Sequence, residues 1–351
     1  MKVAILDPYL DTLGGGERYL LSIAEYYSKN HAVDIFWPDQ SLRTKIKQRF
    51  QMSISQVQFR EYPLNAIDRY SLFSQYDLFF YATDGSLFYS PAKKSILLIQ
   101  SPAHIPNGGK LFTKIKMSSW NKVLCYSRFV KEIIDKKIGR KAIVLEPPVD
   151  LESFLPGKKE NIILITGRFF SFLHSKKQDF LVDCFIELIT KKHLTGWKLI
   201  LIGSVQDKDA DGYLAKIKKV SQGYPIKIIT DASLDVLKDY YAKAKIFWLA
   251  TGFGEDLITF PERAEHFGIV TVEAMAAECV PIVFNGGGQT EIVNQAKNGF
   301  LFKSKDELMK QTLSVIKNED QRLKLAQQAK NRSTDFSKER FLSKLEKIVH
   351  D

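Results

Sequence analysis

Cysteine is scarce in this chain, and long apolar runs are absent. The three cysteines among 351 residues, Cys125, Cys184 and Cys279, are far apart and lack the close spacing of metal ligands. A sparse, odd set of this kind predicts reduced thiols in a cytoplasmic protein instead of a disulfide framework. No apolar stretch reaches the roughly 20 residues needed to span a bilayer, so we expect no transmembrane helix.

Two familiar nucleotide-binding motifs are missing as well. The chain contains neither the dinucleotide fingerprint G-x-G-x-x-G nor the P-loop G-x-x-x-x-G-K-[ST]. A dehydrogenase with two Rossmann-like domains would need the first motif, so only binding of NAD would support that alternative. Internal repeats and low-complexity tracts are also absent, which argues against solenoid and disordered architectures.

The sequence does contain a regular alternation of short aliphatic runs and segments of helical period. Runs of this length, apolar on both faces, predict parallel strands covered by helices on two sides. In the first half the runs are Val3–Leu6, Val33–Phe36, Leu78–Tyr81, Ile96–Ile99, Val123–Tyr126 and Ile143–Leu145. In the second half they are Ile162–Ile165, Leu199–Ile202, Ile226–Ile229, Ile246–Leu249 and Ile282–Phe284. The pattern predicts an α/β protein with two doubly wound, Rossmann-like domains.

A proline-rich stretch separates the two series of strands. It runs from Glu146-Pro147-Pro148-Val149-Asp150 to Pro156-Gly157-Lys158-Lys159. We therefore expect an N-terminal domain over residues 1–152, a C-terminal domain over 153–320, and a helical tail over 321–351 that can return to the first domain. Ligands of open α/β sheets bind beyond the carboxyl ends of the strands, so two such domains predict a site in a cleft between them.

Part of the formal charge of +11 is concentrated in one segment. Residues 110–141 hold ten lysines and arginines, opposed only by Glu132 and Asp135, which leaves a net charge of +8. One interpretation is a solvated helical face. The other is a surface that faces anionic lipid or a phosphate-bearing acceptor. Nucleic acid fits less well, because no binding motif or aromatic stacking platform accompanies the charge.

Glycines and cations follow several of the expected strands. Gly14-Gly15-Gly16 comes after the first strand, where such a run serves either as a tight turn or as an approach for phosphate at a helix N-terminus. Arg168 follows Thr166-Gly167 at the end of the first strand of the second domain, and Lys176 stands at the start of the next helix. Two cations so placed can bind a diphosphate from two directions, and the alternative is a pair of surface cations.

The segment from Pro261 to Ala277 carries two glutamates, Glu265 and Glu273. Gly268 stands where a helix should begin, and apolar residues after it give that helix a buried face. The two carboxylates would lie at most about 12 Å apart along the helix axis, which suits the two ends of a nucleotide sugar. A further glycine run, Gly286-Gly287-Gly288, follows the next strand, and a tight turn explains it equally well.

One acidic run imitates a metal site. Asp207-Lys208-Asp209-Ala210-Asp211-Gly212 resembles the opening of a calcium loop, but Lys218 occupies the twelfth position, where such a loop needs a bidentate glutamate. A solvated loop fits the run better. Because basic residues are available for a diphosphate, we expect no metal ion or other cofactor to be required.

Taken in their order along the chain, these motifs resemble glycosyltransferase family 4, whose members are retaining enzymes with the GT-B fold. The resemblance rests on Gly167-Arg168, Lys176, the segment from Glu265 to Glu273, and Gly286-Gly287-Gly288 with Glu291. Ser127-Arg128-Phe129-Val130 and Pro147-Pro148-Val149-Asp150 with Phe154 are similar to the interdomain connection of that family. The run Glu265-His266-Phe267-Gly268-Ile269 is most similar to mannosyltransferases that extend lipid-linked oligosaccharides.

The resemblance implies a role for each matching position. Arg168, Lys176 and Glu265 would be catalytic, with the two cations on the diphosphate and the carboxylate on the transferred sugar. The donor would also be bound by Gly15, Gly16, Gly167, Lys177, Phe267, Gly268, Ile269, Val270 and Glu273, the last through the ribose hydroxyls. Family members often carry a histidine where this chain has Gln100, so either Gln100 or His104 would take that role.

These observations predict a retaining hexosyltransferase. We expect it to move a sugar from a nucleoside diphosphate sugar, with GDP-mannose favoured, to a glycan or lipid-linked acceptor. We expect a cytoplasmic protein with peripheral contact to an anionic membrane through residues 110–141. The alternative is a non-catalytic subunit that keeps the fold and a nucleotide-sugar pocket. The unusual Gln100 favours that alternative, and the cations and paired glutamates disfavour it.

Overall fold

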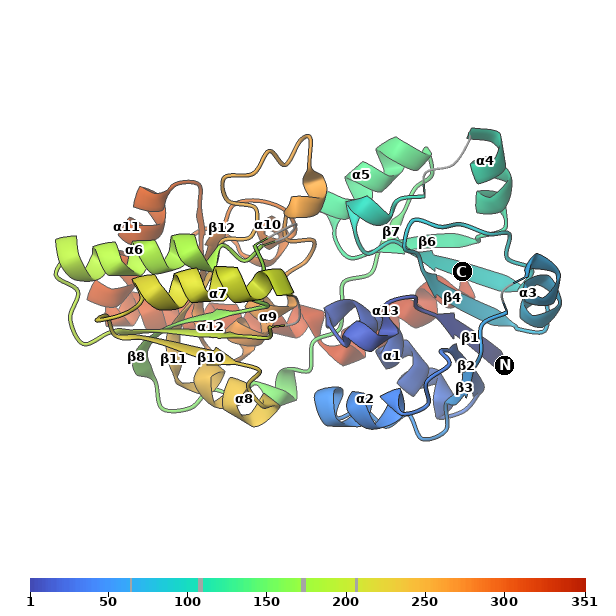
Figure 1. Ribbon diagram of the computed structural model, residues 1–351, viewed down its shortest axis with the longest axis horizontal. Helices are drawn as coiled ribbons and strands as arrows, with labels where there is room; N and C mark the ends of the chain where they lie inside the picture. Colours follow the sequence, from blue (N-terminus) through green and yellow to red (C-terminus); the bar gives the residue numbers. More distant parts are fainter. Residues whose placement is uncertain (64, 107–109, 172–174, 206–207) are drawn as a thin grey trace. The chain divides into compact units, whose positions relative to one another are not determined.

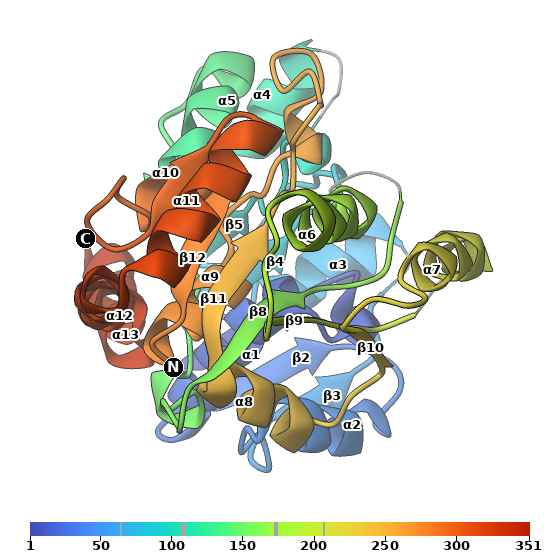
Figure 2. The same cartoon turned by 90° about the vertical axis from the view of Figure 1, so that its left-hand side faces the viewer.

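The chain divides into two compact units. The computed structural model describes residues 1–63, 65–106, 110–171, 175–205 and 208–351, with the backbone only of residues 110 and 208–211. The first unit comprises Met1–Pro148 and Glu339–Asp351, and the second comprises Val149–Lys338. In the described ranges each unit is built on a parallel β-sheet with helices packed against it (Figures 1 and 2).

The sheet of the first unit has seven strands in the order β3-β2-β1-β4-β5-β6-β7. The strands are β1 (Lys2–Leu6), β2 (Ala32–Phe36), β3 (Gln58–Arg60), β4 (Leu78–Ala82), β5 (Lys94–Leu98), β6 (Lys122–Cys125) and β7 (Ile143–Val144). β1, β4 and β5 are buried along nearly their whole length, as expected for strands that are covered on both faces.

Helices cover this sheet. They are α1 (Gly15–Ser28), α2 (Leu42–Phe50), α3 (Ala66–Phe73), α4 (Lys110–Ser118) and α5 (Arg128–Ile138), with 3-10 helices at Leu10–Thr12 and Pro102–His104. On one face, Phe73 of α3, Met117 of α4 and Val130 of α5 share a core with aromatic strand residues. Short-range sequence signals set the ends of α5. The Ser127 side chain accepts a hydrogen bond from the Val130 N–H, and Gly139 ends the helix in the left-handed region.

The sheet of the second unit has six strands in the order β10-β9-β8-β11-β12-β13. They are β8 (Glu160–Thr166), β9 (Lys198–Gly203), β10 (Ile226–Thr230), β11 (Ala244–Leu249), β12 (Val280–Phe284) and β13 (Phe300–Phe302). From β8 the chain proceeds outward to β10 and then returns to β11 on the other side of β8. Such a reversal is the point at which ligands bind in doubly wound sheets, so the loops after β8 and β11 are where a site is expected.

Helices also cover the second sheet, with α6 and α7 on one side and α8 on the other (Figure 1). They are α6 (Gln178–Lys191), α7 (Lys208–Val220), α8 (Leu234–Lys243), α9 (Ile269–Ala276), α10 (Gln289–Ile292), α11 (Lys305–Lys317) and α12 (Glu319–Ser333), with 3-10 helices at Leu151–Ser153, Pro261–Arg263 and Thr334–Phe336. The core includes Trp248, whose Nε1 donates to the Thr312 hydroxyl at 3.1 Å, so its polar atom is satisfied. No helix in the described ranges is long and apolar enough to cross a membrane.

The predicted fold class, two doubly wound α/β units with parallel sheets, is confirmed. The short strands β3 and β13 lie outside the runs that the sequence pattern identified. The division between units falls at Pro148/Val149, whereas we expected it after residue 152. The expected tail over 321–351 is divided, because α12 belongs to the second unit and α13 (Lys338–His350) to the first.

The last helix, α13, completes the core of the first unit. Phe341 packs edge-on against Tyr19 of α1 with 4.9 Å between ring centroids, and Glu346 accepts a hydrogen bond of 2.9 Å from the Tyr27 hydroxyl. Phe341, Leu345 and Val349 are buried. The apolar spacing of these residues is that of a helix with one buried face, and Figure 1 shows α13, in red, beside α1.

Replacing Phe341 with alanine tests the packing of α13. Removal of a buried aromatic ring leaves a cavity and should lower the free energy of unfolding by about 3–5 kcal/mol. Urea denaturation followed by circular dichroism measures the change. Leu323→Ala, at a position of α12 that is 52% exposed, is the control and should shift the free energy by less than about 0.5 kcal/mol. Wild-type stability of Phe341→Ala would contradict this description of the core.

Candidate donor-binding site

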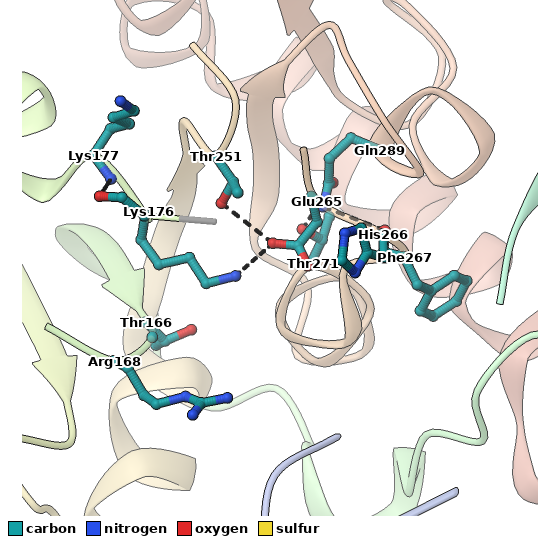
Figure 3. A network of polar contacts seen from close by, with 12 residues as sticks. Thr166, Arg168, Lys176, Lys177, Thr251, Glu265, His266, Phe267, Thr271 and Gln289 are labelled. Carbon is teal, nitrogen blue, oxygen red and sulfur yellow. Dashed lines mark hydrogen bonds and ion pairs between the residues drawn. The ribbon is translucent and has the colours of Figure 1, made fainter. Parts of the chain in front are cut away.

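Polar residues gather where β8 and β11 end in the second unit. Thr166 closes β8 and is followed by Gly167 and the exposed Arg168. Gln178, at the start of α6, donates a hydrogen bond of 2.9 Å to the Arg168 carbonyl and so holds the backbone of this turn. Figure 3 shows the side chains of Arg168 and Lys176 extending to the same side.

Lys176 and Glu265 form an ion pair at the centre of this group. The Lys176 Nζ lies 2.5 Å from the Glu265 Oε2, and the two side chains are only 16% and 14% exposed. The Thr251 hydroxyl, from the loop after β11, donates to the same carboxylate oxygen at 3.2 Å. Partial burial strengthens an ion pair because less water screens it. Glu265 is therefore held from two directions.

Lys177, the neighbour of Lys176, belongs to a different cluster. Its ammonium lies 2.5 Å from Glu255, and Arg263 contacts the same carboxylate at 2.7 Å. The hydrogen bond from Lys177, and after it the one from Arg263, lowers the pKa of Glu255. In Figure 3 Lys177 extends away from Glu265. Of the two adjacent lysines, the structure thus brings Lys176 to Arg168 and Glu265.

The start of α9 follows Glu265 closely. Gly268 is the N-cap of α9 and has a φ of 114°, in the left-handed region that favours glycine. Gln289 fixes the approach to the helix, because its Oε1 accepts a hydrogen bond of 3.0 Å from the Thr271 hydroxyl and its Nε2 donates to the Phe267 carbonyl at 3.5 Å. The first N–H groups of a helix lack intrahelical partners, and Ile269 and Val270 occupy these positions.

The glycine run after β12 supports the segment that carries Glu265. The Gly288 N–H donates a hydrogen bond of 2.7 Å to the Glu265 carbonyl. A Cβ atom on Gly287 would overlap that carbonyl oxygen, and one on Gly288 would lie 2.6 Å from the His266 carbonyl oxygen. Glycine is therefore needed at these positions because two backbone segments are in contact, and not only because the chain turns.

Glu273 lies deeper in the second unit than Glu265. It is 7% exposed, and its Oε2 accepts a hydrogen bond of 3.1 Å from the Tyr241 hydroxyl. That hydroxyl also lies 2.8 Å from the Thr166 Oγ1 at the end of β8. Burial, and then the nearby Glu273, raises the pKa of Tyr241 well above its ordinary value. Tyr241 therefore stays protonated and links α9 to the turn that carries Arg168.

The glycine run of the first unit follows β1 and so lies at the carboxyl end of its sheet. The candidate site of the second unit lies at the carboxyl end of the other sheet. Gly14 caps α1, which begins at Gly15, and the Gly14 N–H donates to the buried Glu17 carboxylate at 2.6 Å. Gln100 lies so close to Gly16 that a side chain at Gly16 would overlap its amide. His104 instead stacks on Tyr9 with 5.4 Å between ring centroids, and burial lowers the pKa of His104. Gln100, and not His104, therefore lies at the glycine run.

Asp7, directly after β1, is an almost fully buried carboxyl group. It is 1% exposed, and its Oδ1 accepts a hydrogen bond of 3.0 Å from the Tyr9 N–H. Its Oδ2 has no hydrogen-bond partner in the described part of the chain. Burial, and then the nearby Glu17, raises the pKa of Asp7 to about 8. Asp7 is therefore mostly uncharged at neutral pH.

Three residues of the second-unit site were absent from the sequence prediction. Thr251 follows β11, so the rule that identified Arg168 at a strand end would have found it. Tyr241 lies in α8 and Gln289 begins α10, and no local pattern marks either one. Their roles come from tertiary packing.

The acidic run that resembles a calcium loop falls largely outside the side chains that the structure describes. Asp207 lies outside the described residues, and the backbone of α7 begins at Lys208. Among the side chains that the structure describes, no group of three or more His, Cys, Asp or Glu residues is placed to hold a metal ion.

The fold of the chain is that of the GT-B glycosyltransferases. A glycosyltransferase from Rickettsia africae superimposes with a TM-score of 0.77 at 19% identity, over 99% of this chain and 97% of that one. Anabaena HepE in complex with UDP-glucose superimposes with a TM-score of 0.74 at 17% identity, over 100% of this chain and 99% of that one. At these identities the likeness establishes the fold.

The chain belongs to the family of glycosyl transferases group 1, whose model matches residues 149–332. An uncharacterized glycosyltransferase of Methanocaldococcus jannaschii is 26% identical over 245 residues, which is 69% of this chain and 63% of that protein. The human GDP-Man:Man(3)GlcNAc(2)-PP-Dol alpha-1,2-mannosyltransferase is 25% identical over 238 residues, 60% of this chain and 45% of that protein. The chain thus spans about half to two thirds of the length of these relatives.

The raised pKa of Asp7 predicts a loss of stability as the pH rises. The carboxyl ionises near pH 3.8 in the unfolded chain, but it keeps its proton to about pH 8 in the folded one, where its pKa is raised. Folding between these values takes up a proton, so the free energy of unfolding falls with rising pH. Asp7→Asn keeps the acceptor for Tyr9 and cannot ionise. Its free energy of unfolding should exceed that of wild type by several kcal/mol at pH 8, because each unit by which the two pKa values differ corresponds to about 1.4 kcal/mol, and should match it near pH 4.

Denaturation of both proteins at pH 4, 6 and 8 measures this difference. Asp183→Asn, at an exposed position of α6, is the control and should follow wild type at every pH. A constant offset between Asp7→Asn and wild type would argue against the protonated carboxyl.

Proposed function

We propose that this chain is a retaining glycosyltransferase of family 4. It transfers a sugar, with mannose favoured, from a nucleoside diphosphate sugar to an acceptor hydroxyl. The observation that carries the proposal is the Lys176–Glu265 ion pair beside Arg168, at the ends of β8 and β11. The names of similar proteins support it, since the human relative is named for GDP-Man and HepE was solved with UDP-glucose.

Donor binding would change the partner of Lys176. In the structure, Glu265 neutralises this lysine. A diphosphate carries more negative charge than one carboxylate, and Arg168 offers it a planar pair of donors from the neighbouring turn. Once Lys176 turns to the phosphate, Glu265 keeps its bond from Thr251 and accepts hydrogen bonds from the sugar hydroxyls. The donor thereby completes both the phosphate half and the sugar half of the site.

The same cations would assist the transfer. As the bond between the sugar and the diphosphate breaks, negative charge grows on the leaving phosphate oxygen, and Arg168 and Lys176 stabilise it. The N–H groups at the start of α9, at Ile269 and Val270, add the positive end of a helix dipole. The acceptor oxygen bonds to the sugar on the face that the leaving group vacates, and the acceptor's proton passes to the departing phosphate oxygen. Because two cations stabilise the charge on the leaving group, the proposed mechanism uses no metal ion.

The acceptor is proposed to be a glycan or a lipid-linked saccharide. The name of the human relative includes a PP-Dol-linked glycan, and the basic segment 110–141 would suit a protein that works at an anionic membrane surface on the cytoplasmic side. The alternative function is a non-catalytic subunit that binds the nucleotide sugar. It predicts donor binding without donor consumption, including the slow hydrolysis that a transferase shows in the absence of an acceptor.

Alanine substitutions of the two cations test the mechanism. Arg168→Ala and Lys176→Ala should each lower kcat by about 10²–10³, because each removes a charge that stabilises the leaving group. Donor hydrolysis or transfer, followed as release of the nucleoside diphosphate, gives the rates. Lys191→Ala, a surface position at the end of α6, is the control and should stay within about twofold of wild type.

Lys177→Ala distinguishes the adjacent lysines. Its partner is Glu255, so we expect a smaller loss than for Lys176→Ala. Near-normal rates in both Arg168→Ala and Lys176→Ala would refute the proposed mechanism.

A thermal-shift screen identifies the donor. GDP-mannose should raise the melting temperature more than UDP- or ADP-sugars at equal concentration, because a ligand stabilises the native state more the further its concentration exceeds its Kd. At about 100 times Kd the stabilisation corresponds to about 2.7 kcal/mol. A shift with UDP-glucose alone would replace mannose in the proposal. No shift with any of the three donors would count against a nucleotide-sugar site.

A further inference from the structure

We propose that α4 is a membrane-binding element that inserts apolar side chains into the headgroup region of an anionic bilayer. Three large apolar residues of this helix, Leu111, Phe112 and Ile115, are 68%, 72% and 51% exposed. Apolar side chains that gather at the surface mark binding sites more often than isolated ones do. This proposal does not depend on sugar transfer, and it goes beyond the charge of segment 110–141 because it assigns the contact to named apolar side chains.

The three exposed residues form one stripe along α4. At about 100° per residue, Leu111, Phe112 and Ile115 fall on the same side of the helix. Met117, which is 5% exposed and belongs to the core of the first unit, falls on the opposite side. A surface helix ordinarily buries its apolar side and exposes a polar one. α4 instead buries one apolar side and exposes another.

Lysines flank the stripe. By the same geometry Lys114 lies to one side of the apolar residues and Lys116 to the other, and both are exposed. No aspartate or glutamate occurs between residues 110 and 122. A stripe of Leu, Phe and Ile with lysines at its borders is the pattern of helices that lie in a membrane interface, where lysines meet lipid phosphates and apolar groups enter the acyl boundary.

The first unit holds the C-terminal end of α4 firmly. Arg140 donates hydrogen bonds to the Met117 carbonyl at 2.7 Å and to the Asn121 carbonyl at 2.8 Å. The Trp120 Nε1 donates to the Phe88 carbonyl at 3.0 Å. These bonds fix the helix against the unit, so the exposed stripe is presented by an anchored element.

A second exposed group lies on helices of the same layer. Ile67 and Tyr70 of α3 are 81% and 58% exposed, and Tyr70 stacks on Tyr89, which is 51% exposed. α3 and α4 both contribute to the core that covers one face of the sheet. Tyrosines are enriched at membrane–water interfaces because the ring is apolar and its hydroxyl polar. This group adds a second set of exposed apolar side chains to the first unit.

Lipid fits the stripe better than a protein partner or a second copy of the chain. Three side chains provide a few hundred Å² at most, whereas a stable protein interface buries about 800 Å² on each partner. Two copies that met through α4 would also bring Lys114 and Lys116 of one chain against the same lysines of the other. An anionic membrane satisfies the charges and needs no matching surface.

Sedimentation with vesicles tests the proposal. Wild type should bind vesicles that contain phosphatidylglycerol and not vesicles of phosphatidylcholine alone, and part of the binding should persist at 0.5 M salt, a concentration of about three times the physiological ionic strength. Phe112→Ser should lower the partition coefficient at least about tenfold, and Lys114→Gln should lower it roughly fivefold. The matched controls are Leu323→Ser and Lys324→Gln on α12, an exposed leucine and an exposed lysine that should leave binding unchanged.

A second readout reports insertion directly. The emission of a tryptophan introduced as Phe112→Trp should be quenched by brominated lipid, after subtraction of the wild-type signal, and that of Leu323→Trp should not. Equal binding of Phe112→Ser and Leu323→Ser, or no binding by wild type, would overturn the proposal. So would a dimer, detected by light scattering, that Phe112→Ser dissociates in the absence of vesicle binding. Every variant should show the same donor-induced thermal shift as wild type. Equal shifts would show that the variants are folded and that the loss of vesicle binding is independent of donor binding.

Discussion

The site of the second unit depends on the close contact between two backbone segments. The Gly288 N–H binds the Glu265 carbonyl, and Gly287 and Gly288 lie where side chains would collide with residues 265 and 266. This contact sets the position of the Glu265 carboxylate and the direction in which α9 begins. A larger residue in the glycine run would displace the acidic segment from Lys176 and Thr251, which come from other elements. The contact thereby holds together the loops that follow β8, β11 and β12.

The arrangement of the candidate site depends on the pairing of two opposite charges, those of Lys176 and Glu265. Lys176 and Glu265 neutralise one another in a place with little water, and Arg168 remains at the surface. A partly buried pair of opposite charges is stable only while both are present, so a ligand that draws away the lysine must supply negative charge of its own. The proposed donor, a nucleoside diphosphate sugar, would supply that charge and would offer hydroxyls to the carboxylate. The Lys176–Glu265 ion pair thus connects the observed structure with the proposed mechanism.

The first unit combines a similar sheet with different surface chemistry. Its carboxyl-end residues include Asp7, which accepts a hydrogen bond from the Tyr9 N–H, and Gln100, whose amide lies against Gly16 of α1. Its outer helical layer carries exposed apolar groups and lysines on α4. The candidate donor-binding site therefore lies in the second unit and the candidate membrane contact in the first. This division agrees with a family model that matches residues 149–332.

Local sequence patterns were enough to predict the two α/β units, since fully buried parallel strands must be continuous apolar runs. They were also enough to place Arg168 and Gly268, which stand directly after a strand and before a helix. The pattern could not separate Lys176 from Lys177. Which lysine meets Glu265 depends on the turn before α6, where Lys177 adopts a left-handed conformation with a φ of 53°. Nor could it show that α12 and α13 belong to different units, because both have ordinary amphipathic spacing.

By itself the sequence determined most of the strands, the order of the motifs and the position of the cations and glycines at strand ends, because these follow from neighbours along the chain. Only the tertiary structure decided that Tyr241 and Gln289 support the site and that the Thr251 hydroxyl contacts Glu265. It also decided that the apolar residues of α4 face outward while Met117 faces the core. The physical reason is the same in each case. These contacts join residues far apart in sequence, and their partners are chosen by how whole elements pack.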